Sequence, residues 1–412
     1  MRIESSITRE DGFMEVKIVT DSYQSCIRDL EKNGFQKYVD NGEKGLNNNV
    51  FTTTLQKENQ VVTVIHIAKQ KLTYMVFEHD VALSKRLFND DMYAVEHKEG
   101  AKETLHMLES YHPGNSFVLQ LKNGHFLLCD GGARIELPYL ISYLESLTPE
   151  GEKPIVEAWF VTHPHWDHAG VFLTFEEDAS YAQRIYVEGI YVEPFNDELL
   201  EQFKCGYLFE GIEKAASALT NSDGTPTQIY HPHAGERYFF DDITVEVMLT
   251  RLQIPKEKWF RYKGNMNEAS VWYMFHIDGQ KYLNAGDADL GAMKEVMEIY
   301  DKEYLDMDIM AVQHHGINVH NEFTDFIKVK TLLYPYFGID GVYKEGLDWP
   351  GAWQASVYRN EYLQSKARES MSYGDGTKIL TFPYQTGTAI SLPTRGERAE
   401  LTGIHIERKI QY

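Results

Sequence analysis

Cysteines are few in this sequence. Only three occur among 412 residues, Cys26, Cys129 and Cys205, and they are far apart. An odd number of isolated cysteines excludes a disulfide framework and a CxxC metal-binding knuckle. The composition therefore indicates a protein of a reducing compartment, and we expect it to be cytoplasmic.

Long hydrophobic runs are missing too. No stretch reaches the ~18 apolar residues that a membrane-spanning helix needs. The first residues, MRIESSITRE, lack the apolar core of a secretion signal. We therefore expect neither secretion nor contact with a membrane, and the sequence leaves the oligomeric state open.

Positive charge is scarce. The chain has 40 lysines and arginines against 62 aspartates and glutamates, a net charge of −22. An electric field of this sign repels long polyanions. No dense group of lysine and arginine alternates with aromatic residues, as a nucleic-acid channel would require. A long nucleic acid is therefore not an expected partner.

The sequence predicts two parts. In residues 1–95, MEVKIVT alternates like a strand and SYQSCIRDLEKNGF has the pattern of a helix, which indicates a small α+β module of unknown role. In residues 101–412, strands alternate with helices, beginning with a hairpin that turns at Asn123-Gly124. One helix is expected over 196–220. This pattern predicts an α/β sandwich of four layers, helix, sheet, sheet and helix.

Histidines are clustered at two places. His163, His165 and His168 fall within six residues, together with Asp167, directly after the apolar strand PIVEAWFVT. In an extended loop a spacing of two places His163 and His165 on the same side, while Asp167 and His168 turn toward a neighbouring centre. This spacing predicts two adjacent metal ions. The second cluster is the adjacent pair of His314 and His315.

The pattern His163-x-His165-x-Asp167-His168 resembles the signature of the metallo-β-lactamase superfamily, and the resemblance extends over roughly residues 105–390. Three further elements follow the family order: LLCDGG, LNAGDAD and VQHHG. The family fold is the αββα sandwich expected above. The resemblance also implies hydrolysis at a centre of two divalent metals.

The resemblance implies a ligand set. His163 and His165 would hold the first metal, and Asp167, His168 and one of the pair would hold the second. The sequence does not indicate which of His314 and His315 is the ligand, and the other would contact substrate or stabilise a leaving group. Two aspartates complete the site: Asp287 would bridge both metals, and Asp130 would support the ligands from behind. Aspartate is also common at helix N-termini and in turns. The alternative interpretations are that Asp287 caps the next helix and that Asp130 is an ordinary turn residue.

One family element is missing. Lactamases, glyoxalase II and lactonases place a third histidine of the first metal after a strand like VEVMLT, but here RLQIPKEKWFRYKGNMNEASV follows. His231 and His233 are weaker candidates, because they precede that strand. The sequence has Asn265 and Asn267 instead, in a pattern that resembles the branch of the ComEC-type competence nuclease and bacterial phosphorylcholine esterases.

The chemistry follows from the predicted ligands. Two adjacent divalent ions lower the pKa of a bound water toward roughly 7 and stabilise an in-line displacement at phosphorus. We therefore expect hydrolysis of a phosphoester, with Asp167, Asp287 and His314 as catalytic residues. Imidazole and carboxylate ligands favour zinc, with manganese and iron as alternatives. Acyl hydrolysis of a lactone, lactam or thioester is the second interpretation, and a non-catalytic metal-binding or regulatory protein is the third.

Clues to the substrate are limited. Asn267 lies next to the ligand motifs, and Trp349 and Trp353 lie in a loop rich in glycine and proline, where exposed rings can stack on a ligand. Two divalent metals add four positive charges to a site with two aspartates. A small phosphorylated substrate is therefore compatible with a protein of net charge −22.

Overall fold

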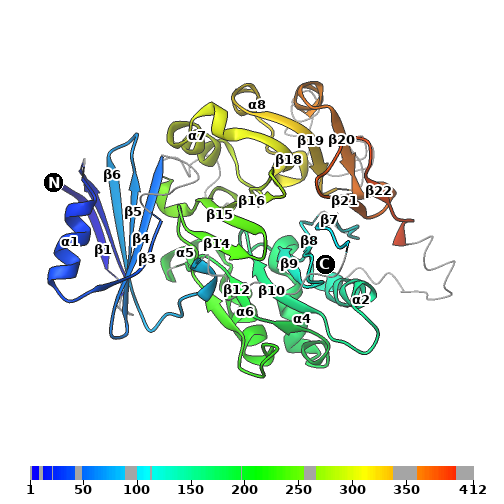
Figure 1. The fold of residues 1–412 in the computed structure, drawn as a ribbon, viewed down its shortest axis with the longest axis horizontal. Helices are drawn as coiled ribbons and strands as arrows, with labels where there is room; N and C mark the ends of the chain where they lie inside the picture. Colours follow the sequence, from blue (N-terminus) through cyan, green and yellow to red (C-terminus); the bar gives the residue numbers. More distant parts are fainter. Residues whose placement is uncertain are drawn as a thin grey trace.

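The computed structural model describes residues 2–8, 13–20, 22–41, 49–88, 100–111, 114–195, 197–254, 266–336 and 360–395. These residues form three β-sheets with helices packed on them (Figure 1). No helix in these ranges combines the length and the apolar character that crossing a membrane requires.

The first sheet comes entirely from the N-terminal residues and is antiparallel. Its strand order is β1-β2-β6-β5-β4-β3, and helix α1 (Gln24–Lys32) covers one of its faces. The strands are β1 (Arg2–Thr8), β2 (Met14–Val19), β3 (Gln36–Asp40), β4 (Val50–Lys57), β5 (Gln60–Ile67) and β6 (Leu72–His79).

Strand β5 shows why this sheet packs on both faces. Val62 and Val64 join the core under α1, whereas Ile65 and Ile67 join a core shared with the rest of the chain. Side chains of a strand alternate between the two faces, so an apolar residue at nearly every position requires cover on both sides. The N-terminal sheet therefore packs directly against the larger part of the molecule (Figure 1).

The second sheet has the order β13-β12-β10-β9-β8-β7-β21-β22, with β11 paired to β10 outside this path. Its strands are β7 (Thr104–Met107), β8 (Phe117–Gln120), β9 (Phe126–Cys129), β10 (Ile155–Phe160), β11 (Tyr186–Val187), β12 (Gly189–Tyr191), β13 (Gln228–Tyr230), β21 (Lys378–Thr381) and β22 (Ile390–Ser391). Strands β8 and β9 form the predicted hairpin. Strands β9, β10, β12 and β13 run parallel, so their carboxyl ends lie at one edge.

The third sheet has the order β14-β15-β16-β17-β18-β19-β20. Its strands are β14 (Arg237–Phe240), β15 (Ile243–Leu249), β16 (Trp272–Ile277), β17 (Gln280–Asn284), β18 (Asp306–Ala311), β19 (Lys328–Tyr334) and β20 (Glu369–Ser372). Strands β17 to β20 are parallel.

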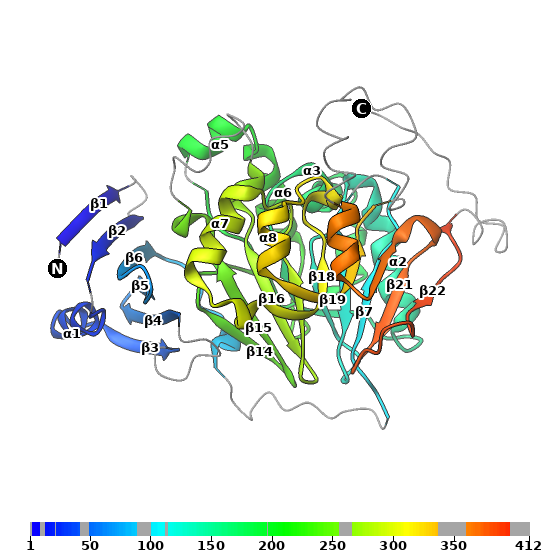
Figure 2. The same ribbon diagram turned by 90° about the horizontal axis from the view of Figure 1, so that it is seen from above.

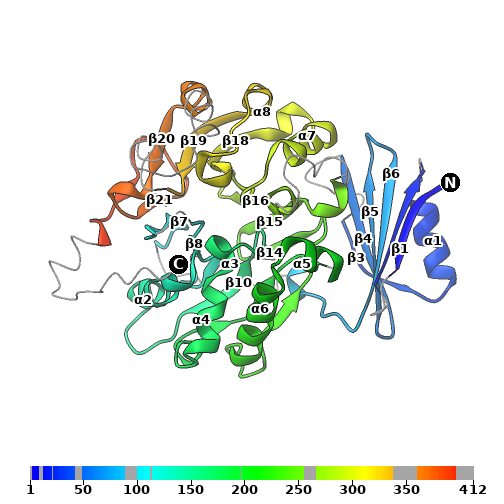
Figure 3. The ribbon, with the colours of Figure 1, turned by 180° about the vertical axis from the view of Figure 1, so that it is seen from behind.

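Helices cover the outer faces of these two sheets. On the second sheet lie α2 (Leu137–Leu147), α4 (Val171–Glu177) and α6 (Gly206–Ala218), as Figure 3 shows. On the third sheet lie α7 (Leu290–Ile299) and α8 (Asn321–Phe326). Between the sheets, aromatic side chains such as Phe117, Phe160, Tyr273 and Tyr282 form a separate core. This αββα arrangement confirms the predicted four-layer sandwich.

One predicted element is wrong. The single helix expected over 196–220 is two helices, α5 (Asp197–Phe203) and α6, because Lys204 between them has a φ of 54°. A left-handed residue cannot continue an α-helix. The break lets Leu199 and Cys205 pack against Met266 and Ala269, which the straight helix would not allow.

Candidate metal centre

Loops at the ends of four strands bring the candidate ligands together. Asp130 directly follows β9, and the histidine motif follows β10 in the second sheet. Asp287 follows β17, and His315 follows β18 in the third sheet. Because both pairs of strands are parallel, their carboxyl ends meet at the same edge of the sandwich.

The first group of ligand atoms comes from Asp167, His168, Asp287 and His315, all of them buried. His168 Nε2 lies 3.0 Å from Asp287 Oδ1. His315 Nε2 lies 3.2 Å from Asp167 Oδ2 and 3.6 Å from Asp287 Oδ1. Two imidazoles and two carboxylates thus converge within the reach of one ion.

The second group comes from His163, His165 and again Asp287. His163 Nε2 lies 2.9 Å from His165 Nδ1 and 4.0 Å from Asp287 Oδ2. Asp287 therefore turns Oδ1 toward one group and Oδ2 toward the other. Such a carboxylate is placed to join two cations.

The glycine before Asp287 allows this close approach. Gly286 has a φ of 51°, and a Cβ atom there would lie 2.6 Å from Thr162 Oγ1. A side chain at this position would separate β17 from the histidine loop. Asp287 does not cap the next helix, because Asp289 fills that role by accepting from the backbone N–H of Leu290.

Hydrogen bonds behind the ligands determine which ring nitrogens face the site. His168 Nδ1 lies 2.7 Å from Asp130 Oδ2, so Nδ1 carries the proton and donates it. In the neutral ring, the form that binds a metal, His168 Nε2 presents its lone pair toward Asp287 Oδ1, and this buried nitrogen has no hydrogen-bond partner among the described residues. His315 follows the same scheme, with Nδ1 donating to Pro335 O at 2.9 Å. Two acceptors face each other at both places, an arrangement that a metal ion between them satisfies.

The pKa values of these groups reflect the same crowding of acceptors. Burial alone would raise the pKa of Asp287, but the charges of His168 and His314 hold it well below its usual range. Burial alone would lower the pKa of His168, but Asp287 and Asp130 raise it well above its ordinary value, so a proton and a metal ion compete for Nε2. Burial lowers the pKa of His163 well below 6.5. The centre thus combines ionised carboxylates with imidazoles and favours a cation.

Asp130 is the central support of the histidine loop. Its Oδ1 accepts from the backbone N–H of Thr162 at 2.7 Å, and its Oδ2 accepts from Thr162 Oγ1 at 2.7 Å and from Asn115 Nδ2 at 2.6 Å. Its φ of 56° is a conformation that aspartate adopts more readily than most residues. The Asp130 carboxylate thus fixes the position of the backbone at Thr162 and the orientation of the His168 ring.

His314 and His315 point to different places. Both have positive φ angles, 48° and 55°, so the chain turns sharply between them. His315 is buried in the first ligand group. The His314 side chain is 23% exposed, with Nε2 3.5 Å from Asp287 Oδ2 and Nδ1 3.2 Å from Asn267 Nδ2. The geometry therefore brings His315, rather than His314, among the ligand atoms.

Of the residues predicted to contact substrate, Asn267 lies beside His314. It belongs to a 3₁₀ turn, Met266–Ala269, which Glu268 fixes to α7 by accepting from the backbone N–H groups of Gly291 and Ala292. Asn265, Trp349 and Trp353 lie outside the described residues.

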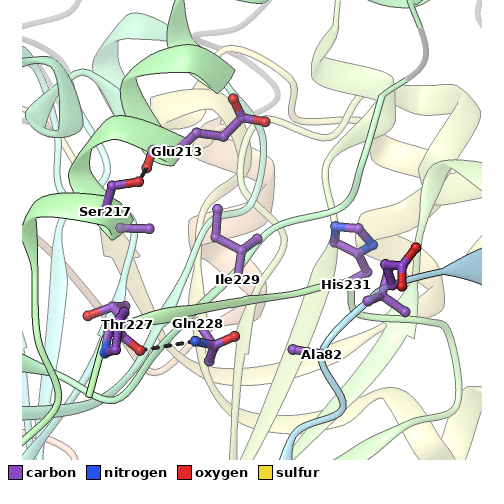
Figure 4. Close-up of a pocket in the computed structure, with 11 residues that line it drawn as sticks. Ala82, Glu213, Ser217, Thr227, Gln228, Ile229 and His231 are labelled. Atoms are coloured by element: carbon purple, nitrogen blue, oxygen red, sulfur yellow. Dashed lines mark hydrogen bonds between the residues drawn. The ribbon is translucent and has the colours of Figure 1, made fainter. Parts of the chain in front are cut away.

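Within the described ranges, no histidine follows β15 into the site. His231 and His233 lie elsewhere. Both contact Glu78 of the N-terminal sheet, His231 Nδ1 at 2.7 Å from Oε1 and His233 Nε2 at 3.1 Å from Oε2. His231 also lines an open cavity of about 400 Å³ between the chain after β6 and helix α6 (Figure 4). These histidines join the N-terminal sheet to the sandwich and do not enter the ligand groups.

Sequence reasoning missed several residues that build the centre. Thr162 and Asn115 bind Asp130, but a single threonine or asparagine carries no signal in a sequence. Trp166 stands inside the histidine motif, yet its exposure of 49% is visible only in the structure. Tyr207, 52% exposed at the start of α6, has no sequence signal.

Comparisons with known proteins agree with this fold. Residues 111–250 match the model of the family described as "Metallo-beta-lactamase superfamily". Over these residues the match agrees with the predicted superfamily, whereas the esterase and competence-nuclease branch stays a prediction. Among curated proteins, none matches this chain.

Solved structures with similar folds are distant relatives at most. CmlA, a diiron β-hydroxylase from Streptomyces venezuelae, is 12% identical, with 68% of this chain and 54% of that chain covered and a TM-score of 0.39. The metallo-β-lactamase fold protein YhfI from Bacillus subtilis is 11% identical, with 65% and 95% covered and a TM-score of 0.37. Zn²⁺-bound PqqB from Methylobacterium extorquens is 11% identical, with 64% and 86% covered and a TM-score of 0.35. This chain spans about half the length of CmlA.

Proposed function

We propose that this metallo-β-lactamase superfamily protein is a hydrolase of small phosphoesters that uses two divalent metal ions. The observation that carries the proposal is the position of Asp287, whose two carboxylate oxygens face two separate groups of ligand atoms. The ions would be held by His163, His165 and Asp287 on one side and by Asp167, His168, Asp287 and His315 on the other.

When bound, two such ions activate a water and stabilise charge during in-line displacement at phosphorus. The second group offers three protein ligands, so its ion would keep open coordination positions for an oxygen of the substrate. The ligand set contains imidazoles and carboxylates but no thiolate, which favours zinc over softer metals, with manganese and iron as alternatives.

The remaining residues have distinct roles in this proposal. Asp130 fixes the tautomer of His168 and the backbone of Thr162, so it positions the ligands without contacting substrate. His314, partly exposed beside Asn267, is placed to donate a proton to the leaving alcohol. A partly exposed histidine in this position can act as the general acid.

Charge supports a small phosphate group as the substrate. The protein as a whole carries −22 and repels long polyanions. Two divalent ions bring four positive charges against the two carboxylates of Asp167 and Asp287, so the centre itself would attract a single phosphate.

Hydrolysis of bis(p-nitrophenyl) phosphate with added zinc or manganese tests the proposal. We expect turnover by the wild-type protein and a loss of about 10²-fold or more in Asp287→Asn, because the shared ligand is removed. Turnover of lactones, lactams or thioesters without phosphodiester hydrolysis would replace the proposed reaction with acyl hydrolysis. Bound metal without activity on either class would favour a binding or regulatory protein.

A further inference from the structure

Two large aromatic side chains are exposed next to the candidate metal centre. Trp166 is 49% and Tyr207 is 52% exposed, although almost all other large apolar side chains in the described ranges are covered. Trp166 stands between the candidate ligands His165 and Asp167, so the ligand loop determines its position. Exposed apolar side chains that gather at one place mark contact surfaces more often than scattered ones do.

Tyr207 belongs to a helix that contacts the one carrying Trp166. It is the second residue of α6, and α6 contacts the short helix α3 (Trp166–Ala169) that carries the tryptophan (Figure 2). Two residues before it, Cys205 packs against Met266, which precedes Asn267.

The two rings thus belong to two helices in contact with each other, one of which carries candidate ligands. An indole and a phenol offer flat, weakly polar faces, which recognise another flat ring by stacking better than they recognise a flexible alkyl chain. The net charge of −22 disfavours a long polyanion, so we take the flat ring to belong to a small molecule.

We propose that Trp166 and Tyr207 are specificity-determining residues that select phosphoesters carrying a planar ring, such as a nucleoside, over phosphoesters of simple alkyl alcohols. This inference rests on the proposed phosphoester hydrolysis and names its substrate class. The metal centre acts on the phosphoryl group, and the two rings bind the flat group beside it.

Two esters with the same leaving group test this proposal. Thymidine 5′-(p-nitrophenyl phosphate) and methyl p-nitrophenyl phosphate both release p-nitrophenolate, so their ratio of kcat/KM reports recognition of the nucleoside. We expect the metal-loaded wild-type protein to prefer the thymidine ester by about tenfold, the size of one stacking contact. Trp166→Leu and Tyr207→Leu should lower this ratio mainly through KM, whereas Trp166→Phe should keep most of it.

The controls separate stacking from other effects. Ile390→Ala removes an apolar side chain that is 55% exposed on β22 and should leave the ratio unchanged. Metal analysis of each variant checks that the neighbouring ligands still hold their ions. A wild-type ratio near one, or a ratio that neither leucine variant changes, would overturn the assignment.

A binding measurement keeps this test independent of the reaction. Calorimetry with thymidine 5′-monophosphate and with methyl phosphate should show tighter binding of the nucleotide, and the leucine variants should remove the difference. If neither ester is hydrolysed but this preference is present, the proposed reaction is wrong and the assignment of Trp166 and Tyr207 stands. Equal binding of the two phosphates would contradict it.

Discussion

The Nδ1 atom of His168 lies 2.7 Å from the Oδ2 atom of Asp130, and both side chains are 0% exposed. This contact forces the ring to present Nε2 to the candidate metal centre. Asp130 is not in either ligand group, yet it determines the chemical form of a ligand. Partners of this kind usually change metal affinity by a factor of about 10 to 100.

Asp130→Asn should therefore weaken metal binding by about 10- to 100-fold. An amide N–H facing His168 Nδ1 would move the ring proton to Nε2 and block the lone pair. Competition against a chromophoric chelator measures the affinity. Asp223→Asn, a change in an exposed turn, is the matched control, and equal affinities in the two variants would contradict the role of Asp130.

The two adjacent histidines should behave differently. His315→Ala removes a buried nitrogen of the first ligand group and should lower the metal content below two ions per chain. His314→Ala should keep the metals but slow hydrolysis of an alkyl phosphodiester, whose alcohol needs a proton to leave, by about 10²-fold, the usual contribution of a general acid. Esters of p-nitrophenol, which leaves as the anion, should be slowed much less. Metal analysis and kcat on the same preparations separate the two. A His315→Ala variant that retains two ions per chain would mean that His314, and not His315, is the metal ligand.

The contact of Glu78 with His233 predicts a dependence of stability on pH. Burial alone would lower the pKa of His233, but Glu78 raises it to about 9, above its ordinary value of 6.5. A raised pKa adds stability that is complete below about pH 6.5 and is lost as the pH rises through 9. Glu78→Gln should therefore lower the free energy of unfolding by roughly 3 kcal/mol near pH 6 and by much less at pH 9.5. Urea denaturation at both values measures this.

The contact between Glu78 and His233 should also lose its stabilising effect at low pH. Burial would raise the pKa of Glu78, but its bonds to His231 and His233 hold it far below 4.5. A lowered pKa adds stability that is present above about pH 4.5 and is lost in stronger acid. Asp80→Asn, an exposed neighbour, is the control and should lack both trends. A cost of Glu78→Gln that does not vary with pH would contradict the assignment.

Gly235 should tolerate substitution less than Gly151, although both have φ angles near 85°. Alanine at either position has a strained backbone, which costs about 1 kcal/mol. At Gly235 a Cβ would also lie 2.2 Å from Thr52 Oγ1 and 2.8 Å from Val50 Cγ1, whereas at Gly151 it would meet no atom within 4 Å. Gly235→Ala should therefore unfold at a lower urea concentration than Gly151→Ala, by an additional 1–3 kcal/mol or so. Equal midpoints would mean that β4 and the loop after β13 do not interlock.

Local patterns in the sequence predicted much of the sandwich. The amphipathic segment LPYLISYLESL is α2, Leu137–Leu147, and Asn123-Gly124 turns the β8–β9 hairpin as expected. The single helix over 196–220 was wrong because the break at Lys204 serves contacts with residues more than 60 positions away, which periodicity does not encode.

The candidate site, too, has parts that local sequence patterns predict and parts that depend on long-range contacts. Histidine spacing and the Gly-Asp and His-His elements name residues that the structure brings together, because each element carries a dense local signal. The choice between His314 and His315 depends on two positive φ angles and could not be read from the sequence. The partner of His233 is 155 positions away, so the role of that histidine emerges only from the fold.

The most direct test of the metal centre is the number of ions per chain. Purified protein, equilibrated with zinc or manganese and freed of excess metal, is analysed by mass spectrometry of its metals against its protein concentration. The two ligand groups that share Asp287 predict close to two ions per chain, and close to none in Asp287→Asn. A wild-type protein that retains one ion or none under these conditions would contradict the binuclear centre.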